Sequence, residues 1–109
     1  SKQEIANWGN MIEGYLNSRK QLGLIIMLVD IRHSPTKNDE IMHNWIEQRN
    51  IPYIIAATKA DKISKSQILR NISTIRTVLG VHETVPIIPV SSSTKQGKDE
   101  IWEQIKLIL

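Results

Sequence analysis

The chain has 109 residues, enough for one small domain, with a formal net charge of +3 and no cysteine. The absence of cysteine excludes disulfides and thiolate metal sites and suits a reducing cytoplasm, where we expect the protein. No apolar run approaches the roughly 20 residues of a membrane-spanning helix, and the first residues are too polar for a signal peptide. The mild basic balance is compatible with RNA contact and equally with ordinary solubility.

Apolar residues follow helical and strand patterns in alternation along the first half of the chain. Residues 3–20 carry apolar side chains at three- and four-residue spacing, which predicts an amphipathic helix. The continuous apolar run Leu24–Val29 predicts a strand buried on both faces. A second strand is predicted at Tyr53–Ala57. Between the strands, a second amphipathic helix is predicted with apolar positions Ile41, Met42, Trp45 and Ile46.

The second half of the chain continues the alternation. Ser64 is predicted to cap a third helix and Gly80 to end it. The apolar positions of this helix are Ile68, Leu69, Ile72, Ile75 and Leu79. A third strand is predicted at Ile87–Val90, and Gly97 precedes a last helix. The side of that helix predicted to be buried carries Ile101, Trp102, Ile105 and Ile108.

Strands that alternate with helices predict an α/β fold with a parallel sheet. In such sheets, ligands bind beyond the carboxyl ends of the strands. Polar residues follow all three predicted strands, at Asp30, Thr58–Asp61 and Ser91–Ser93, and we expect them to meet at one edge. The first strand is the most apolar, whereas an edge strand usually carries charge or proline. We infer that the strand that would pair with it is missing and that the chain is part of a larger domain.

The string Thr58-Lys59-Ala60-Asp61 suits recognition of a guanine base. The carboxylate of Asp61 can accept hydrogen bonds from guanine N1–H and N2–H₂ together, which adenine cannot supply. Lys59 would lay its methylene stem along the purine face, and Thr58 would pin the loop by hydrogen bonding. The alternative is an ordinary loop in which Asp61 helps to cap the next helix, Lys59 is solvated and Thr58 is simply a β-favouring residue.

Val90 leads into the turn Ser91-Ser92-Ser93. A backbone N–H here, that of Ser92 in the first place, could donate to guanine O6 and reject adenine, whose amino group would leave the donor unpaired. The alternative is an ordinary serine-rich turn before a helix. Asp30 could bind a cation or accept a phosphoryl group, but anchoring of the following turn is the favoured interpretation. No histidine spacing indicates a metal site, and we expect none.

What the sequence lacks is equally informative. No G-x-x-x-x-G-K-[ST] motif occurs, so the chain carries residues for reading a base without the loop that holds phosphates.

The strings Asp30–Asp39, Thr58–Ile63 and Val90–Gly97 together resemble the EngB (YsxC, YihA) family of bacterial GTP-binding proteins. The resemblance covers essentially all 109 residues, and the Asp-x-Arg-His-x-Pro-Thr string is specific to that family. It implies a three-layer, Ras-like P-loop GTPase fold, of which residues 1–109 would form the C-terminal half. Proteins of this family are implicated in assembly of the large ribosomal subunit.

The resemblance implies a guanine-nucleotide site formed by two loops. Asp61 would recognise the base with support from Thr58, Lys59 and Ala60, and the serine turn from Val90 to Ser93 would contact O6 through the backbone near Ser92. Thr58 stands where most GTPases have Asn. The P-loop, the first switch and the Asp-x-x-Gly magnesium motif would precede Ser1, so the ligands of Mg²⁺ would lie outside this chain. No catalytic residue is expected here, and the chain alone should not hydrolyse GTP.

The expected cofactor is GTP or GDP, and the expected partner of the intact protein is the large ribosomal subunit, through rRNA or a ribosomal protein. Basic residues could contact RNA phosphates or simply be solvated: Lys65, Arg70, Arg76 and Lys106. The exposed sheet edge should promote self-association of the chain. The alternative is a non-catalytic α/β interaction module or a receiver-like domain. A receiver is disfavoured because Thr58 and Lys59 share one strand end and no acidic pair precedes them.

Overall fold

The computed structural model describes residues 23–108, so the helix predicted over residues 3–20 lies outside the described part. The described elements are β1 (Ile25–Asp30), α2 (Lys37–Glu47), β2 (Tyr53–Thr58), the short 3₁₀ helix η1 (Ala60–Lys62), α3 (Lys65–Leu79), β3 (Ile87–Pro89) and α4 (Lys98–Lys106). From residue 23 onward, the predicted order of strands and helices is confirmed. The limits differ slightly, since β1 runs from 25 to 30 rather than from 24 to 29.

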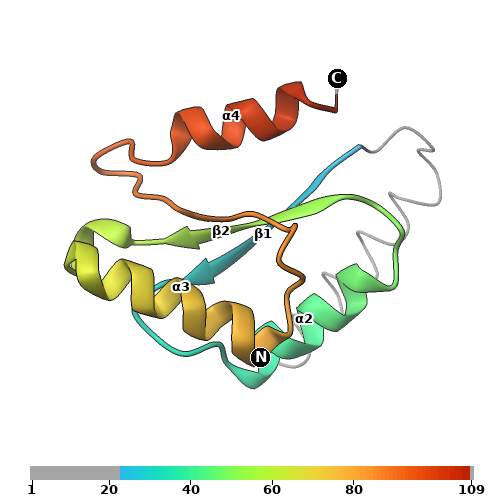
Figure 1. Ribbon diagram of the computed structural model, residues 1–109, viewed down its shortest axis with the longest axis horizontal. Coiled ribbons are helices and arrows are strands. Elements are labelled where there is room, and N and C mark those ends of the chain that lie inside the picture. The colour runs from blue at the N-terminus through green and yellow to red at the C-terminus, as the bar shows by residue number, and fades with distance from the viewer. Residues whose placement is uncertain (1–22, 109) are drawn as a thin grey trace.

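The three strands form one parallel sheet in the order β1-β2-β3. Helices α2 and α3 lie against one face of the sheet and α4 lies over the other, so the architecture has three layers (Figure 1). The register pairs Asp30 of β1 with Thr58 of β2, and Ala57 with Pro89 of β3. All three strands therefore end at the same side of the molecule.

The core lies between the sheet and the α2–α3 layer. Met27 and Val29 of β1 and Ile55 of β2 point into it, together with Ile46 of α2 and Ile75 of α3, and each is at most 3% exposed. Alternate residues of a strand face opposite sides of the sheet, so these positions mark the face that α2 and α3 cover. Burial of aliphatic side chains here supplies the main driving force for folding.

The prediction that the first strand is buried on both faces is wrong for the described structure. Buried residues alternate with more exposed ones along β1, and Leu28 is 65% exposed. Within residues 23–108, β1 pairs only with β2 and forms an edge of the sheet. Leu28 therefore faces solvent on the side of the sheet opposite α2 and α3.

The ends of α3 confirm the predicted caps. The Ser64 hydroxyl accepts a hydrogen bond from Gln67 N–H, and Gly80 adopts the left-handed conformation with φ of 71°. A glycine takes this conformation without the steric cost that a Cβ would add, and it ends the helix.

Several apolar residues predicted to be buried are exposed. Leu69 is 73% exposed and Trp102 is 50% exposed, and Ile41 and Ile108 also face solvent. Neighbouring positions on a helix point about 100° apart. Leu69 of α3 and Trp102 of α4 therefore lie outside the narrow helix faces that contact the sheet. Ile68 and Ile101, one position earlier in each helix, lie on those faces. Ile101 and Ile105 are half-buried, and no residue of α4 is fully buried.

A buried histidine was not predicted as part of the core. His43 of α2 is fully buried, and its Nε2 lies 2.8 Å from the hydroxyl of Tyr53 at the start of β2. Burial lowers the pKa of His43 and raises the pKa of Tyr53 to about 12, which favours the neutral form of both groups. In residues 23–108, no helix has the length and apolar character to cross a membrane.

The packing predicts a large difference between two substitutions in α3. Ile75→Ala removes a side chain that is 1% exposed and should lower the free energy of unfolding by about 2–5 kcal/mol. Leu69→Ala, at a position 73% exposed, should change it by no more than about 0.5 kcal/mol. Urea denaturation followed by circular dichroism measures both, and equal losses would contradict the packing described.

Candidate functional site

The polar residues that follow the three strands lie together, as predicted. β1 ends at Asp30, β2 leads into Lys59 and Asp61, and β3 leads into Ser91. The Lys59 ammonium lies 3.6 Å from an Asp30 carboxylate oxygen, and the Ser91 hydroxyl lies 2.9 Å from a carboxylate oxygen of Asp61. Because the strands are parallel and in register, their carboxyl ends form one continuous polar edge.

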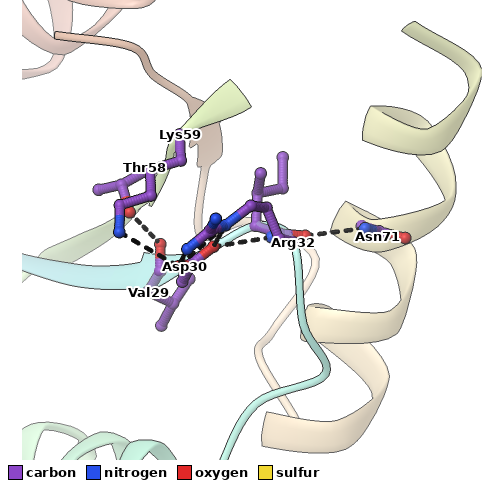
Figure 2. Close-up of polar contacts among 7 residues, drawn as sticks. Val29, Asp30, Arg32, Thr58, Lys59 and Asn71 are labelled. Carbon is purple, nitrogen blue, oxygen red and sulfur yellow. Dashed lines mark hydrogen bonds and ion pairs between the residues drawn. The ribbon is translucent and has the colours of Figure 1, made fainter. Parts of the chain in front are cut away.

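The ends of β1 and β2 are fastened to each other. The Thr58 hydroxyl donates to the Val29 carbonyl at 3.0 Å, and Ile31 N–H donates to the Thr58 carbonyl at 3.0 Å. From α3, the side-chain amide of Asn71 donates to the Ile31 carbonyl at 2.8 Å (Figure 2). Thr58 makes a side-chain hydrogen bond, as predicted, but the bond fastens the end of β2 to the end of β1. Asn71 was not expected here.

Asp61 lies in η1 and receives two serine hydroxyls from the loop after β3. Ser91 donates to Oδ1 at 2.9 Å and Ser93 donates to Oδ2 at 3.2 Å. The Lys62 ammonium lies 3.5 Å from Oδ2, and the Asp61 side chain is 19% exposed. The two loops singled out in the sequence are thus joined by direct hydrogen bonds.

This arrangement leaves Asp61 able to bind a further ligand. An ionised carboxylate offers about four lone-pair sites, and the two serines use two of them. The Ser91 hydrogen bond is the main cause that lowers the pKa of Asp61, so the group is a charged acceptor at neutral pH. Two parallel N–H donors from one ligand would satisfy the remaining sites.

The backbone of the serine turn offers a donor beside this acceptor. Val90 N–H donates to the Ala57 carbonyl, the Val90 carbonyl accepts from Ala60 N–H, and Ser91 N–H donates to the Gln96 carbonyl. In the described part of the chain, Ser92 N–H has no acceptor. The exposed Ser92 N–H could donate to a carbonyl of a ligand, while the charged Asp61 carboxylate accepts from two N–H groups on the same edge of that ligand.

Asp30 anchors the turn after β1. Its carboxylate accepts from the backbone N–H of Arg32 at 2.9 Å and from the guanidinium at 2.8–3.3 Å. The guanidinium holds the pKa of Asp30 far below its usual range. This geometry confirms the favoured interpretation of Asp30 as the anchor of the turn. The ion pair with Lys59 was not predicted.

A pocket of about 500 Å³ lies beside these residues. It is within the range of cavities that hold small ligands. Five of its lining residues belong to the predicted site: Thr58, Lys59, Val90, Ser91 and Ser92. The other four were not predicted as site residues: Lys95, Gln96, Lys98 and Ile101. Asp61 does not line the pocket itself but is joined to it through the Ser91 hydroxyl.

The conformation of the chain between β3 and α4, which lines one side of the pocket, depends on Gly97. Its φ is 85°, and a Cβ there would collide with the carbonyl oxygen of Pro89 and the side chain of Val90. Lys95 nearby is also left-handed, with φ of 66°. A glycine at 97 lets the chain pass close to β3 and begin α4 beside the pocket. Gly97 was the one signal in the sequence that could have indicated the pocket residues that were not predicted.

Residues 23–108 contain no group of three or more His, Cys, Asp or Glu side chains that could hold a metal ion. The three histidines are spread over the loop after β1, α2 and the loop after α3. Magnesium ligands were not expected in this chain.

The sequence and the fold place the chain among GTP-binding domains. The family model described as "Elongation factor Tu GTP binding domain" matches residues 9–109, and solved structures of P-loop GTPases share the fold. The apo elongation factor SelB of Methanococcus maripaludis superposes with a TM-score of 0.71 at 27% identity, over 80% of this chain and 20% of that one.

Within this class, the chain belongs to the EngB family of GTP-binding proteins. It is 46% identical over 105 residues to a probable GTP-binding protein EngB of Clostridioides difficile, covering 96% of this chain and 52% of the relative. The corresponding protein of Limosilactobacillus reuteri is 45% identical over 97% of this chain and 54% of its own length. A crystal structure of a probable EngB protein gives a TM-score of 0.76 at 18% identity, over 91% of this chain and 63% of that one, and shows the same fold. The chain spans about half the length of the curated relatives it matches.

Ser91→Ala should raise the pKa of Asp61 toward its ordinary value, because the lost hydroxyl is the main stabiliser of the carboxylate. The folded-state pKa lies below the unfolded one, so Asp61 stabilises the fold above about pH 4 and loses this effect as the pH falls. The variant should therefore lose less stability on acidification. Carboxyl-carbon NMR titration measures the pKa. Ser92→Ala serves as the control, since Asp61 accepts from Ser91 and Ser93, and an unchanged pKa in Ser91→Ala would contradict the assignment.

Proposed function

We propose that the chain is the base-recognising half of a GTP-binding protein. Asp61 accepts hydrogen bonds from guanine N1–H and N2–H₂, and Ser92 N–H donates to O6. The observation that carries this proposal is the 2.9 Å hydrogen bond from Ser91 to Asp61, which joins the loop after β2 to the loop after β3 beside the pocket. The hydrogen bond orients the carboxylate before a ligand arrives, which reduces the entropy cost of binding.

The same pattern rejects adenine. The adenine amino group would face the Ser92 N–H, so two donors would oppose each other, and adenine has no N–H pair for Asp61. Lys59 lines the pocket, and the methylene stem of a lysine is an apolar surface suited to the face of a purine. These contacts read the base only, and the residues that hold phosphates and Mg²⁺ belong to the other half of the proposed domain.

The intact protein is proposed to act in assembly of the large ribosomal subunit in the cytoplasm, as the resemblance implies. The net charge of +3 is compatible with an RNA surface. Among the basic residues named as candidates, Lys65, Arg70 and Lys106 are exposed. Arg76 is less available, because its guanidinium donates to the carbonyls of His82 and Val85. Binding to large subunits that weakens steeply with salt would support this role.

Asp61→Asn tests base recognition. The substitution should weaken GDP binding at least about 100-fold, because a charged bidentate acceptor becomes an amide with one acceptor oxygen. It should improve binding of the xanthine analogue, whose C2 carbonyl can accept from the new amide. The measurement is fluorescence titration of a chimera in which residues 1–109 replace the matching segment of the Clostridioides difficile relative, so that the phosphate-binding half is present.

Two outcomes of that titration separate the functions. GDP preference over ADP that is lost in Asp61→Asn supports the proposal. Equal binding of GDP and ADP would refute it and favour the alternative, a non-catalytic α/β interaction module. The 109-residue chain alone is the second arm, and it should neither hydrolyse GTP nor bind it tightly.

The chain alone should also self-associate. Among residues 23–108, β1 pairs on one side only, and Leu28 is 65% exposed beside that open edge. Sedimentation should show dimers or larger species that Leu28→Lys shifts toward monomer. Leu69→Lys, at a comparably exposed position on α3, should have no such effect. A monomeric wild-type chain at moderate concentration would count against this expectation.

A further inference from the structure

We infer that Asp30 is a positioning residue of the guanine site, because its carboxylate holds the ammonium of Lys59 and thereby sets the path of the lysine stem. The inference rests on the proposed function and deepens it. Asp30 was expected to anchor a turn, and it does so through Arg32, but the anchor does not account for its contact with Lys59, which follows the neighbouring strand.

The Lys59 side chain would be disordered without a contact that fixes its ammonium. It follows β2 directly, takes the left-handed conformation with φ of 64°, and its side chain is 55% exposed. A lysine stem has four rotatable bonds, and holding it in one conformation costs conformational entropy. If the ammonium were free in solvent, that cost would fall on nucleotide binding. An ion pair present before binding removes part of it.

The Asp30 carboxylate is itself held in place. The residue after it, Ile31, is fully buried, and both backbone groups of Ile31 are bonded, its N–H to the Thr58 carbonyl and its carbonyl to Asn71. The Arg32 fork occupies the carboxylate from the other side (Figure 2). A fixed acceptor can position a flexible donor, whereas a mobile acceptor could not.

The charges on this group also fit the role. One carboxylate lies between two cations, the guanidinium of Arg32 at 2.8 Å and the ammonium of Lys59 at 3.6 Å. The carboxylate therefore stays ionised at physiological pH. The Lys59 contact is exposed, and exposed ion pairs contribute little to the free energy of folding. Its effect should consequently appear in ligand binding rather than in stability.

The ion pair matters because it determines where the Lys59 side chain lies relative to the pocket. Lys59 lines the pocket beside Val90 and Ser91, on the β3 side of β2, while its ammonium is held at the end of β1. The stem therefore crosses the strand ends, with its methylene groups available to a purine face and its charge held at Asp30. Without Asp30, the stem would sample positions that leave the pocket uncovered.

A double-mutant cycle in the chimera tests this inference. Asp30→Asn keeps the size of the side chain and removes its charge, and it should weaken GDP binding about three- to tenfold. In the Lys59→Met background, which keeps an apolar stem without the ammonium, the same substitution should change affinity no more than about twofold. Asp39→Asn is the matched control. Asp39 lies in the next helix and contacts Thr36, and its substitution should leave affinity unchanged.

A second readout does not need the nucleotide. The ε-methylene NMR signals of Lys59 should show a restricted side chain in the 109-residue chain and a freely rotating one in Asp30→Asn. Equal losses of affinity in both backgrounds would overturn the inference, since Asp30 would then act through the turn. Unchanged affinity in Asp30→Asn, with binding still lost in Asp61→Asn, would overturn this inference and leave the proposed function standing. A chimera that shows no guanine preference would overturn the proposed function together with this inference.

Discussion

The parallel register of the sheet is the constraint on which the site depends. Asp30 pairs with Thr58, and Ala57 pairs with Pro89, so three loops leave the sheet at one level. Every contact of the candidate site follows from this alignment, including the Ser91 hydrogen bond to Asp61 across 30 residues of sequence. The aliphatic core between the sheet and the α2–α3 layer holds the alignment, so the apolar packing and the polar site are parts of one arrangement.

The features that the sequence predicted well have local or topological causes. Ser64 and Gly80 mark the ends of α3 because capping depends on the chemistry of single residues. The meeting of Asp61 with the serine turn followed from strand alternation, because parallel strands must end on the same side. Apolar periodicity located the helices but not their exposed sides. Trp102 was assigned to a buried face although only part of α4 contacts the sheet.

The features that sequence alone did not reveal depend on long-range geometry. Asn71 reaches the Ile31 carbonyl over 40 positions, and no local pattern indicates such a contact. Lys95 lines the pocket because the backbone turns left-handed beside Gly97, a conformation that lysine rarely adopts. The pairing of Asp30 with Lys59 likewise requires the register to be known. The fold and the meeting of Asp61 with the serine turn were therefore accessible from sequence, whereas the other pocket residues and the contact of Asp30 with Lys59 were not.

Because the three strands end in register, the site constrains where residues can be inserted or deleted. Neighbouring strands are about 4.8 Å apart, and a residue advances a strand by about 3.3 Å. The Ser91–Asp61 and Lys59–Asp30 contacts of 2.9 and 3.6 Å leave less slack than one residue of strand. One inserted or deleted residue in β1, β2 or β3 would also turn each following side chain to the opposite face. Insertions should therefore be tolerated in the part of the loop between Arg32 and α2 or at the N-terminal ends of the strands, and selection on this domain should act on strand length as strictly as on residue identity.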